Sequence, residues 1–148
     1  MPESNGMTTA TDASDAEGDE VVGEWPSRIA AITLFVEDLD ASKRFYQDAF
    51  GLPVFFEDNE SAVFTFGDTL VNLLKTTKAP ELIAPGRVAR HEDGSRLVFT
   101  IKVDDVDAKC AELTGRGVEL LNGPMDRPWG PRTASFRDPG GHIWEIAT

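Results

Sequence analysis

The sequence contains an internal repeat, and this feature restricts the possible folds more than any other. The segment Val36-Glu-Asp-Leu-Asp-Ala41 recurs as Val103-Asp-Asp-Val-Asp-Ala108, so that position 36 of one copy corresponds to position 103 of the other. The predicted elements around each copy also follow the same order. We therefore expect two similar modules that fold together, because one module alone would leave one face of its sheet bare.

The first copy has the pattern of a strand, a helix and three further strands. Residues 29–36 are apolar and β-branched enough for a strand that is buried on both faces. Asp38 stands at an N-cap position, apolar residues then recur every three or four positions, and Gly51 ends the predicted helix. Three short strands are expected next, at residues 53–57, 61–66 and 69–74.

The second copy repeats this order after a connection that is rich in Pro, Gly and charged residues. Residues 96–103 predict a strand, and Asp105 is placed to cap a helix that the glycines at positions 115 and 117 end. The buried stripe of this helix is formed by Val106, Cys110 and Leu113. Three more strands are predicted at residues 118–121, 133–136 and 142–146.

These patterns predict an α+β protein in which two tandem βαβββ modules form curved mixed sheets around a cavity. We expect residues 1–24 to be a flexible acidic tail and residues 25–148 to form one domain. Within that domain, repeat one spans about 28–75, the connection about 76–95 and repeat two about 96–147.

The formal net charge of -12 is unevenly distributed along the chain. Residues 1–24 hold seven acidic residues and no Lys or Arg, and they contain too few apolar residues to offset the entropy of ordering a chain. An alternative is that this segment is an interaction arm, docking on a neighbour through Val21, Val22 and Trp25. The rest of the chain is only mildly acidic and shows no concentrated basic face, which argues against a nucleic-acid partner.

Compartment and membrane signals point to a protein of the cytoplasm. The sequence has no apolar run near the length of about 20 residues that a membrane span needs. It also lacks the basic start and apolar stretch of a secretory signal, and its single cysteine, Cys110, has no partner for an internal disulfide. A reducing cytoplasm is therefore expected.

Four motifs carry a resemblance to a known family. They are Leu34-Phe-Val-Glu-Asp-Leu-Asp-Ala-Ser42, Phe45-Tyr46 followed by Phe50-Gly51-Leu52, the segment 103–108, and the closing hairpin Phe136-Arg-Asp-Pro-Gly-Gly-His-Ile-Trp-Glu-Ile146. In this order they resemble the vicinal oxygen chelate superfamily, which includes glyoxalase I, extradiol dioxygenases, fosfomycin resistance proteins and bleomycin-binding resistance proteins. The resemblance covers about residues 28–147 and implies the glyoxalase/bleomycin resistance/dihydroxybiphenyl dioxygenase fold, without specifying one activity.

The resemblance also implies where a metal would be held, and the residues at those places are poor ligands. Metal-using members take ligands from the first strand of each repeat and a carboxylate from the last. The matching positions here are Ala31 and Val98, which cannot bind a metal, together with Asn72 and Glu145 on the last strands. We expect no metal cofactor, with a divalent metal kept as the alternative; His142 is predicted on the opposite face and His91 in the connection.

Glu145 is the only good ligand of this set and has two interpretations. Alternation along the last strand sends Trp144 and Ile146 beneath a helix and Glu145 into the cavity. There it could be a catalytic acid or base with a raised pKa, or it could anchor a ligand or serve the structure. The anchoring or structural role is favoured, because no second catalytic group is evident.

Other candidate ligand-binding residues are aromatic or basic. Trp129 and Arg132 lie in a loop before a predicted strand, where they could stack on a planar ligand and hold a carboxylate or phosphate. Alternatively, the Trp covers the edge of the core and the Arg pairs with an acid. Phe35 and Phe64 are chiefly core candidates, although on a concave face they could line a pocket.

The leading hypothesis is a metal-independent small-molecule binding protein, similar to the bleomycin-resistance branch and acting as a homodimer. The ligand would sit between the sheets near Asn72, Arg132 and Glu145. One alternative is a glyoxalase-like lyase, an isomerase or a dioxygenase that uses a divalent metal. Another is an accessory domain whose cavity has lost its role and whose working surface is the tail.

Overall fold

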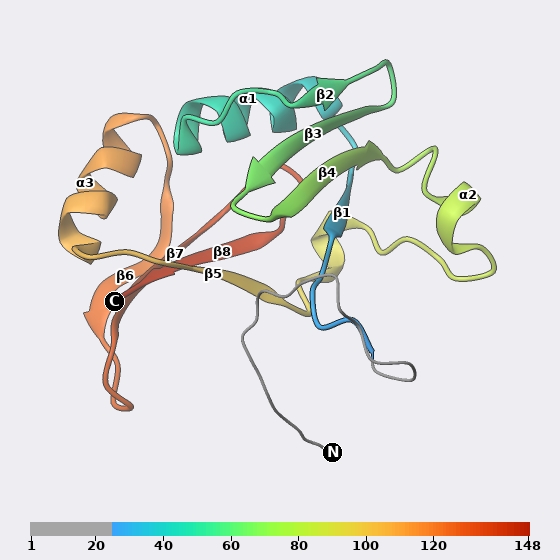
Figure 1. Cartoon of the computed structure of the whole chain (residues 1–148). Helices are drawn as coiled ribbons and strands as arrows, with labels where there is room; N and C mark the ends of the chain where they lie inside the picture. The colour runs from blue at the N-terminus through green and yellow to red at the C-terminus, as the bar shows by residue number, and fades with distance from the viewer. Residues whose placement is uncertain (1–24) are drawn as a thin grey trace.

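The computed structural model describes residues 25–148, and these form two four-stranded mixed sheets with a helix on one face of each (Figure 1). The predicted acidic tail lies outside the described residues. No helix among residues 25–148 is both long and apolar enough to cross a membrane. The predicted α+β class and the two βαβββ modules are confirmed.

Sheet A, built from repeat one, has the strand order β1-β4-β3-β2. β1 pairs with β4 in parallel, and the remaining pairs are antiparallel. Helix α1 lies between β1 and β2 in the sequence and packs against β3 and β4. The elements are β1 (Ala31–Val36), α1 (Leu39–Phe50), β2 (Phe56–Glu57), β3 (Ser61–Phe66) and β4 (Thr69–Lys75).

Sheet B, built from repeat two, has the equivalent order β5-β8-β7-β6. β5 pairs with β8 in parallel, as β1 does with β4. The connection between the sheets is less irregular than predicted, because it contains the short helix α2 (Pro80–Ile83) and a 3-10 turn (His91–Asp93). The other elements are β5 (Val98–Lys102), α3 (Val106–Gly115), β6 (Leu120–Asp126), β7 (Arg132–Arg137) and β8 (Ile143–Ala147).

Both helices begin where the sequence predicts, because their caps are made by the repeated motif. Asp38 Oδ1 accepts the Ala41 N–H at 3.0 Å, and Asp105 Oδ1 accepts the Ala108 N–H at the same distance. Each bond satisfies one of the unpaired donors at a helix start. Gly51 ends α1 in the left-handed conformation, with φ of 69°, which a residue with a side chain seldom adopts.

Several strand boundaries were predicted wrongly. β1 begins at Ala31 and is an edge strand that is buried on one face only, so the expectation of burial on both faces is wrong. The predicted strand at 53–57 shrinks to two residues, and β5 is shorter than 96–103. β6 is the largest error: it continues to Asp126 through Gly123-Pro124, where the register shifts. An edge strand tolerates proline and an irregular register, because its outer N–H groups have no partner.

The helix-side faces of the two sheets share one core, which is rich in aromatic side chains. Tyr46 of α1 stacks on Phe64 of β3 with ring centroids 5.5 Å apart, and Phe66 stacks on Trp144 of β8 at 5.2 Å. Phe136 of β7 is fully buried in the same cluster. Repeat one and repeat two are thus joined through a common interior on their helix-side faces, whereas the sequence predicts that the pairing covers the opposite, bare faces.

A buried polar chain crosses this core. The Trp144 indole N–H donates to the Tyr46 hydroxyl at 3.1 Å, and that hydroxyl donates to Asp138 Oδ2 at 2.7 Å. Burial, followed by the charge of Asp138, raises the pKa of Tyr46 far above its ordinary value. The phenol therefore stays protonated and remains a donor to the carboxylate.

Candidate functional site

The face of sheet A that points away from α1 carries a hydrogen-bonded pair at its centre. Parallel pairing of β1 with β4 sets Thr33 beside Asn72, and Asn72 Nδ2 lies 3.5 Å from Thr33 Oγ1. The other amide atom of Asn72, Oδ1, is buried and has no partner among the described residues. Buried acceptors are normally hydrogen-bonded, so this oxygen requires a donor that the described residues do not supply.

The corresponding face of sheet B carries the equivalent pair in the second repeat. Thr100 on β5 is set beside Glu145 on β8, and the Thr100 hydroxyl donates to Glu145 Oε1 at 2.8 Å. Thr100 stands 67 positions after Thr33, the same offset as the repeated motif. Each sheet thus presents a threonine next to a residue with acceptor oxygens. Sequence analysis missed these pairs, although the matching threonines were a visible signal.

We refer to these surfaces as the open faces of sheets A and B, defined by the residues that alternate with the core positions. On sheet A they are Ala31, Thr33, Phe35, Ser61, Val63, Thr65, Leu70, Asn72 and Leu74. On β5, β7 and β8 of sheet B they are Val98, Thr100, Lys102, Thr133, Ser135, Arg137, Ile143, Glu145 and Ala147.

The donor set on the open faces does not fit a metal centre. Glu145 is the single carboxylate, imidazole or thiolate among the open-face residues, and a catalytic transition-metal site needs at least three such ligands. Residues 25–148 also contain no group of three or more His, Cys, Asp or Glu side chains arranged to hold an ion. Ala31 and Val98 stand at matching places beside Leu70 and Ile143, so neither strand supplies a ligand there.

Arg132 is the first residue of β7, and its guanidinium is paired with carboxylates of the protein instead of being free to hold a ligand. Arg132 Nε and Nη2 each donate to the Asp107 carboxylate at 3.0 Å, and Nη1 donates to Asp126 at 3.1 Å. These carboxylates raise the pKa of Arg132. The guanidinium holds the start of α3 to β6 and β7, as the structural alternative for this residue predicts. Trp129 is 72% exposed, with the Arg127 guanidinium 5.8 Å from its ring.

The two phenylalanines named from the sequence lie on opposite sides of sheet A. Phe64 is fully buried in the shared core against Tyr46, which confirms the core interpretation and rules it out as a ligand-binding residue. The reason is strand alternation, which gives Phe64 the same face as the buried Ala62. Phe35 alternates with the buried Leu34 and Val36, and it therefore lies on the open face.

Asn72 and Glu145 do not line a common hollow within one chain. The hollow at Asn72, about 390 Å³, is formed by Ser61 and Leu74 of sheet A together with Glu81 and Leu82 of α2, and Glu145 is not part of its lining. The predicted enclosure by both sheets is thus not completed by residues 25–148 of a single chain. The two sheets use their helix-side faces to form the shared core, so the open face of each sheet lies on the side opposite that core.

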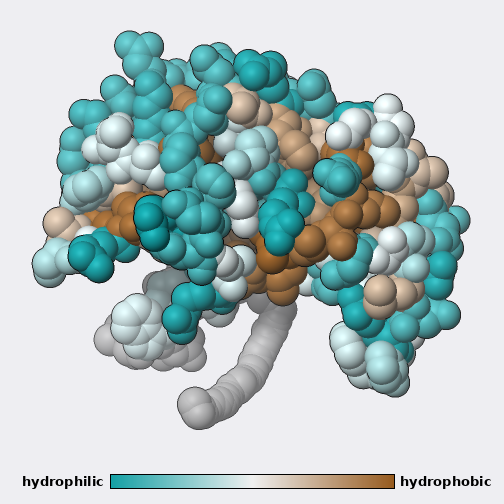
Figure 2. Space-filling view, turned by 180° about the vertical axis from the view of Figure 1, so that it is seen from behind, coloured by the Kyte–Doolittle hydropathy of each residue, from teal (hydrophilic) through white to brown (hydrophobic). Residues whose placement is uncertain are grey.

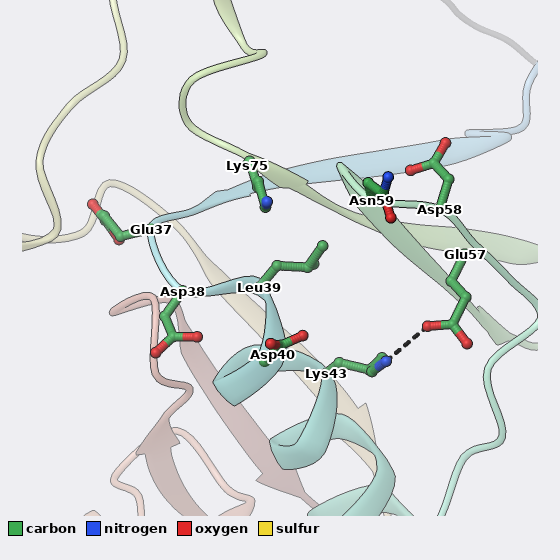
Figure 3. A pocket seen from close by; sticks show the side chains of 9 residues that line it. All are labelled: Glu37, Asp38, Leu39, Asp40, Lys43, Glu57, Asp58, Asn59 and Lys75. Carbon is green, nitrogen blue, oxygen red and sulfur yellow. Dashed lines mark hydrogen bonds and ion pairs between the residues drawn. The ribbon is translucent and has the colours of Figure 1, made fainter.

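A larger hollow, about 790 Å³, lies between the start of α1 and the turn after β2 (Figure 3). Its walls are mostly carboxylates, and the Lys43 side chain extends toward Glu57, with Nζ 2.7 Å from Oε1. Asp38 is already engaged as the helix cap. These are exposed charges that pair with one another or with water, and they do not assemble a ligand site.

Comparison with known proteins identifies related chains. The sequence model of the Glyoxalase/Bleomycin resistance protein/Dioxygenase superfamily matches residues 28–146. The uncharacterized protein YraH of Bacillus subtilis is 35% identical over 123 residues, covering 80% of this chain and 96% of that protein. The metallothiol transferase FosB of Lysinibacillus sphaericus is 28% identical over 113 residues, 76% of each chain. A glyoxalase/bleomycin resistance protein/dioxygenase from Nocardioides has a TM-score of 0.76 at 24% identity, covering 85% of each chain.

Proposed function

The chain belongs to the Glyoxalase/Bleomycin resistance protein/Dioxygenase superfamily, and we propose that it binds a small organic molecule without the aid of a metal. The observation that carries this proposal is the composition of the open faces, where Glu145 is the single side chain of a kind that metals prefer. The superfamily fold is retained, whereas its usual ligand positions are Ala31 and Val98. Such a surface favours sequestration or transport of a ligand over metal-assisted chemistry.

The polar groups of the open faces indicate the chemistry of the ligand. Asn72 Oδ1 is an acceptor without a partner, and Glu145 has one oxygen bonded to Thr100 and a second that can accept another donor. The same open faces also carry apolar residues, such as Phe35 on β1 and Val98 on β5. An apolar molecule that carries an ammonium, guanidinium or amide N–H group matches this arrangement.

A second copy of the chain is proposed to complete the site, with the open face of sheet A of one copy opposite the open face of sheet B of the other. β1 and β5 are both edge strands, so each has a row of backbone groups that no neighbouring strand of its sheet pairs. Val98 is 51% exposed on the open face of sheet B. The back of the molecule also shows a band of apolar residues between hydrophilic ones (Figure 2).

Isothermal calorimetry tests the binding function. The purified protein is titrated with bleomycin and a panel of hydrophobic cationic antibiotics, with and without chelator. Saturable binding that is insensitive to chelator is expected, and Glu145→Gln should weaken it about tenfold or more, because a bond to a charged acceptor is lost. Lys109→Gln on the outer surface of α3 is the matched control. If no compound saturates the protein, the proposal fails.

Light scattering tests the assembly. The wild-type protein is expected at twice the chain mass, whereas Val98→Lys places a charge on the proposed interface and should give the monomer. Elemental analysis of the same samples should find no stoichiometric transition metal. A dimer mass that Val98→Lys leaves unchanged would show that the open face of sheet B is not the interface.

The alternative function is an enzyme of the superfamily, such as a glyoxalase-like lyase, an isomerase or a dioxygenase, with a divalent metal and with Glu145 as a catalytic group. The likeness to a protein named a metallothiol transferase favours keeping it. The residues of the open faces do not fit the three ligands that this chemistry needs. A purified protein that retains a stoichiometric metal, and loses it in Glu145→Gln, would establish the alternative.

A further inference from the structure

A third hollow lies between β1, the end of the connection and the turn that joins β7 to β8. Its volume is about 280 Å³, and neither Asn72 nor Glu145 belongs to its lining. Apolar residues form much of the wall, among them Phe35 and Val88. Both histidines of the chain, His91 and His142, also line it.

His142 is held in one orientation by a buried carboxylate. Its ring atom Nδ1 lies 3.0 and 3.1 Å from the two oxygens of Asp138, and its backbone N–H donates to Asp138 Oδ1 at 2.8 Å. The Asp138 side chain is fully buried, whereas that of His142 is 20% exposed. A carboxylate that receives hydrogen bonds from the Tyr46 hydroxyl and the His142 backbone N–H is fixed in place.

This contact decides which ring nitrogen of His142 carries the hydrogen. Both atoms that face Nδ1 are carboxylate oxygens, so Nδ1 must be the donor. In the neutral ring, Nε2 is then left as an acceptor. The ring also packs against Gly140, where a Cβ would lie 2.9 Å from Cε1 and 3.0 Å from Nδ1. The turn glycine therefore makes room for this ring position.

We propose that this hollow binds a planar weak acid, a phenol or an enol, through proton transfer to His142 Nε2. The O–H bond of the ligand breaks, its electron pair stays on the oxygen, and a new N–H bond forms at Nε2. Asp138 stabilises the imidazolium that results, as a carboxylate on the far side of a histidine does in acid–base sites. Arg96, which also lines the hollow, adds positive charge beside the new anion.

Other charged groups also lie at the hollow. Arg90 is engaged with Asp93, with Nη2 3.2 Å from Oδ1, and Glu37 lines the hollow on the side of β1. The His91 side chain is 54% exposed and faces Glu92, with Nδ1 3.8 Å from Oε1. His142 is thus the one histidine of the chain that a buried carboxylate positions.

Nitrogen-detected NMR tests the positioning directly, because the chain has only two histidines. The spectrum of the His91→Asn variant lacks the signals of one histidine ring, and this assigns the remaining signals to His142. His142 is expected in the neutral form that carries its hydrogen on Nδ1, which is the less common tautomer of a free imidazole. Finding the hydrogen on Nε2 of neutral His142 would overturn the proposal.

Absorbance titration with para-nitrophenol tests the site. At a pH below the pKa of the free probe, the full-length protein should produce the yellow phenolate saturably, and para-nitroanisole, which has no proton to give, should compete more weakly. His142→Asn keeps an N–H donor for Asp138 but removes Nε2, and it should weaken the phenolate signal about tenfold or more. Lys109→Gln should leave the signal unchanged.

Two results would overturn the proposal: no saturable phenolate signal with the wild-type protein, or an unchanged signal in a folded His142→Asn variant. If that variant fails to fold, the tautomer measurement on the wild-type protein decides the question. Failure of this proposal can be told from failure of the proposed cation-binding function, because the antibiotic titrations report on Glu145 and this probe on His142.

Discussion

Repeat one and repeat two share their strand order and helix caps, but they bring different side chains to the open faces. In repeat one, Thr33 is beside the neutral Asn72, whereas in repeat two, Thr100 is beside the charged Glu145. α1 contributes the aromatic residues of the shared core, while the buried side chains of α3 are the smaller Val106, Cys110 and Leu113. The comparison shows that one strand order and one pair of helix caps suffice to give the same module twice, although the side chains on the helices and on the open faces differ.

The largest effect is expected at the matched core positions of the two repeats. Phe64 and Phe136 occupy equivalent places on β3 and β7, and both are fully buried. Each change to alanine should lower the free energy of unfolding by about 3–5 kcal/mol, because it leaves a cavity. Urea denaturation followed by circular dichroism and tryptophan fluorescence measures the loss.

The shared core further predicts that each alanine variant unfolds in a single transition by both probes. Where alanine prevents folding, the leucine variants at Phe64 and Phe136 should show the same behaviour with smaller losses. Two separate transitions, one for each repeat, would break the comparison, since they would mean that the modules are stable independently.

Tyr46 joins the two repeats, and its contribution to the free energy of unfolding is expected to be lost at alkaline pH. Because its pKa in the folded protein lies above the ordinary value of about 10, its stabilising contribution is complete below that pH and is lost as the pH rises toward the folded-state pKa. Tyr46→Phe removes the donor to Asp138 and should cost about 1–3 kcal/mol at neutral pH.

Tyr46 is also the single tyrosine of the chain, so near-ultraviolet difference absorbance reports on it alone. The tyrosinate signal should appear only together with alkaline unfolding. In urea titrations above pH ~10, the wild-type protein should lose stability more steeply than Tyr46→Phe. A tyrosinate signal in the folded protein near the ordinary pKa would show that the buried link between the repeats is absent.

A smaller loss of stability is expected at the two helix caps, and it should be equal in the two repeats. Asp38→Ala and Asp105→Ala each remove one bond of 3.0 Å to a backbone N–H, and each should cost about 1 kcal/mol in the free energy of unfolding. Asp38→Asn and Asp105→Asn serve as controls, because asparagine caps nearly as well. Losses that differ strongly between the repeats would sharpen the comparison by showing that one helix start is supported by other contacts.

The smallest effect concerns the pairs on the open faces. Thr100→Val removes a 2.8 Å bond to a carboxylate on an accessible surface and should cost up to about 1 kcal/mol, whereas Thr33→Val, which removes a contact of 3.5 Å, should cost less. Thermal unfolding of matched samples measures both. A larger loss for Thr33→Val would reverse the expected order of the two pairs.

Features with a local cause could be predicted from the sequence. The repeated motif correctly marked both helix starts, because a cap depends on a side chain and a backbone N–H three residues later. Strand alternation correctly placed Trp144 and Ile146 in the core, on the face opposite Glu145. β6 was missed beyond residue 121, because a Gly-Pro pair has the pattern of a turn unless a neighbouring strand is known to hold it.

The sequence by itself determined two modules of one topology, their helix starts and the absence of metal-type side chains at Ala31 and Val98. The tertiary structure decided that Arg132 pairs with Asp107 and Asp126, that Asp138 fixes His142, and that the open faces of the two sheets do not enclose a common cavity within residues 25–148 of one chain. The physical reason is the separation along the chain of the residues that interact. Caps and alternation depend on neighbours along the chain, whereas partners for long side chains and the enclosure of a cavity depend on segments that only folding brings together.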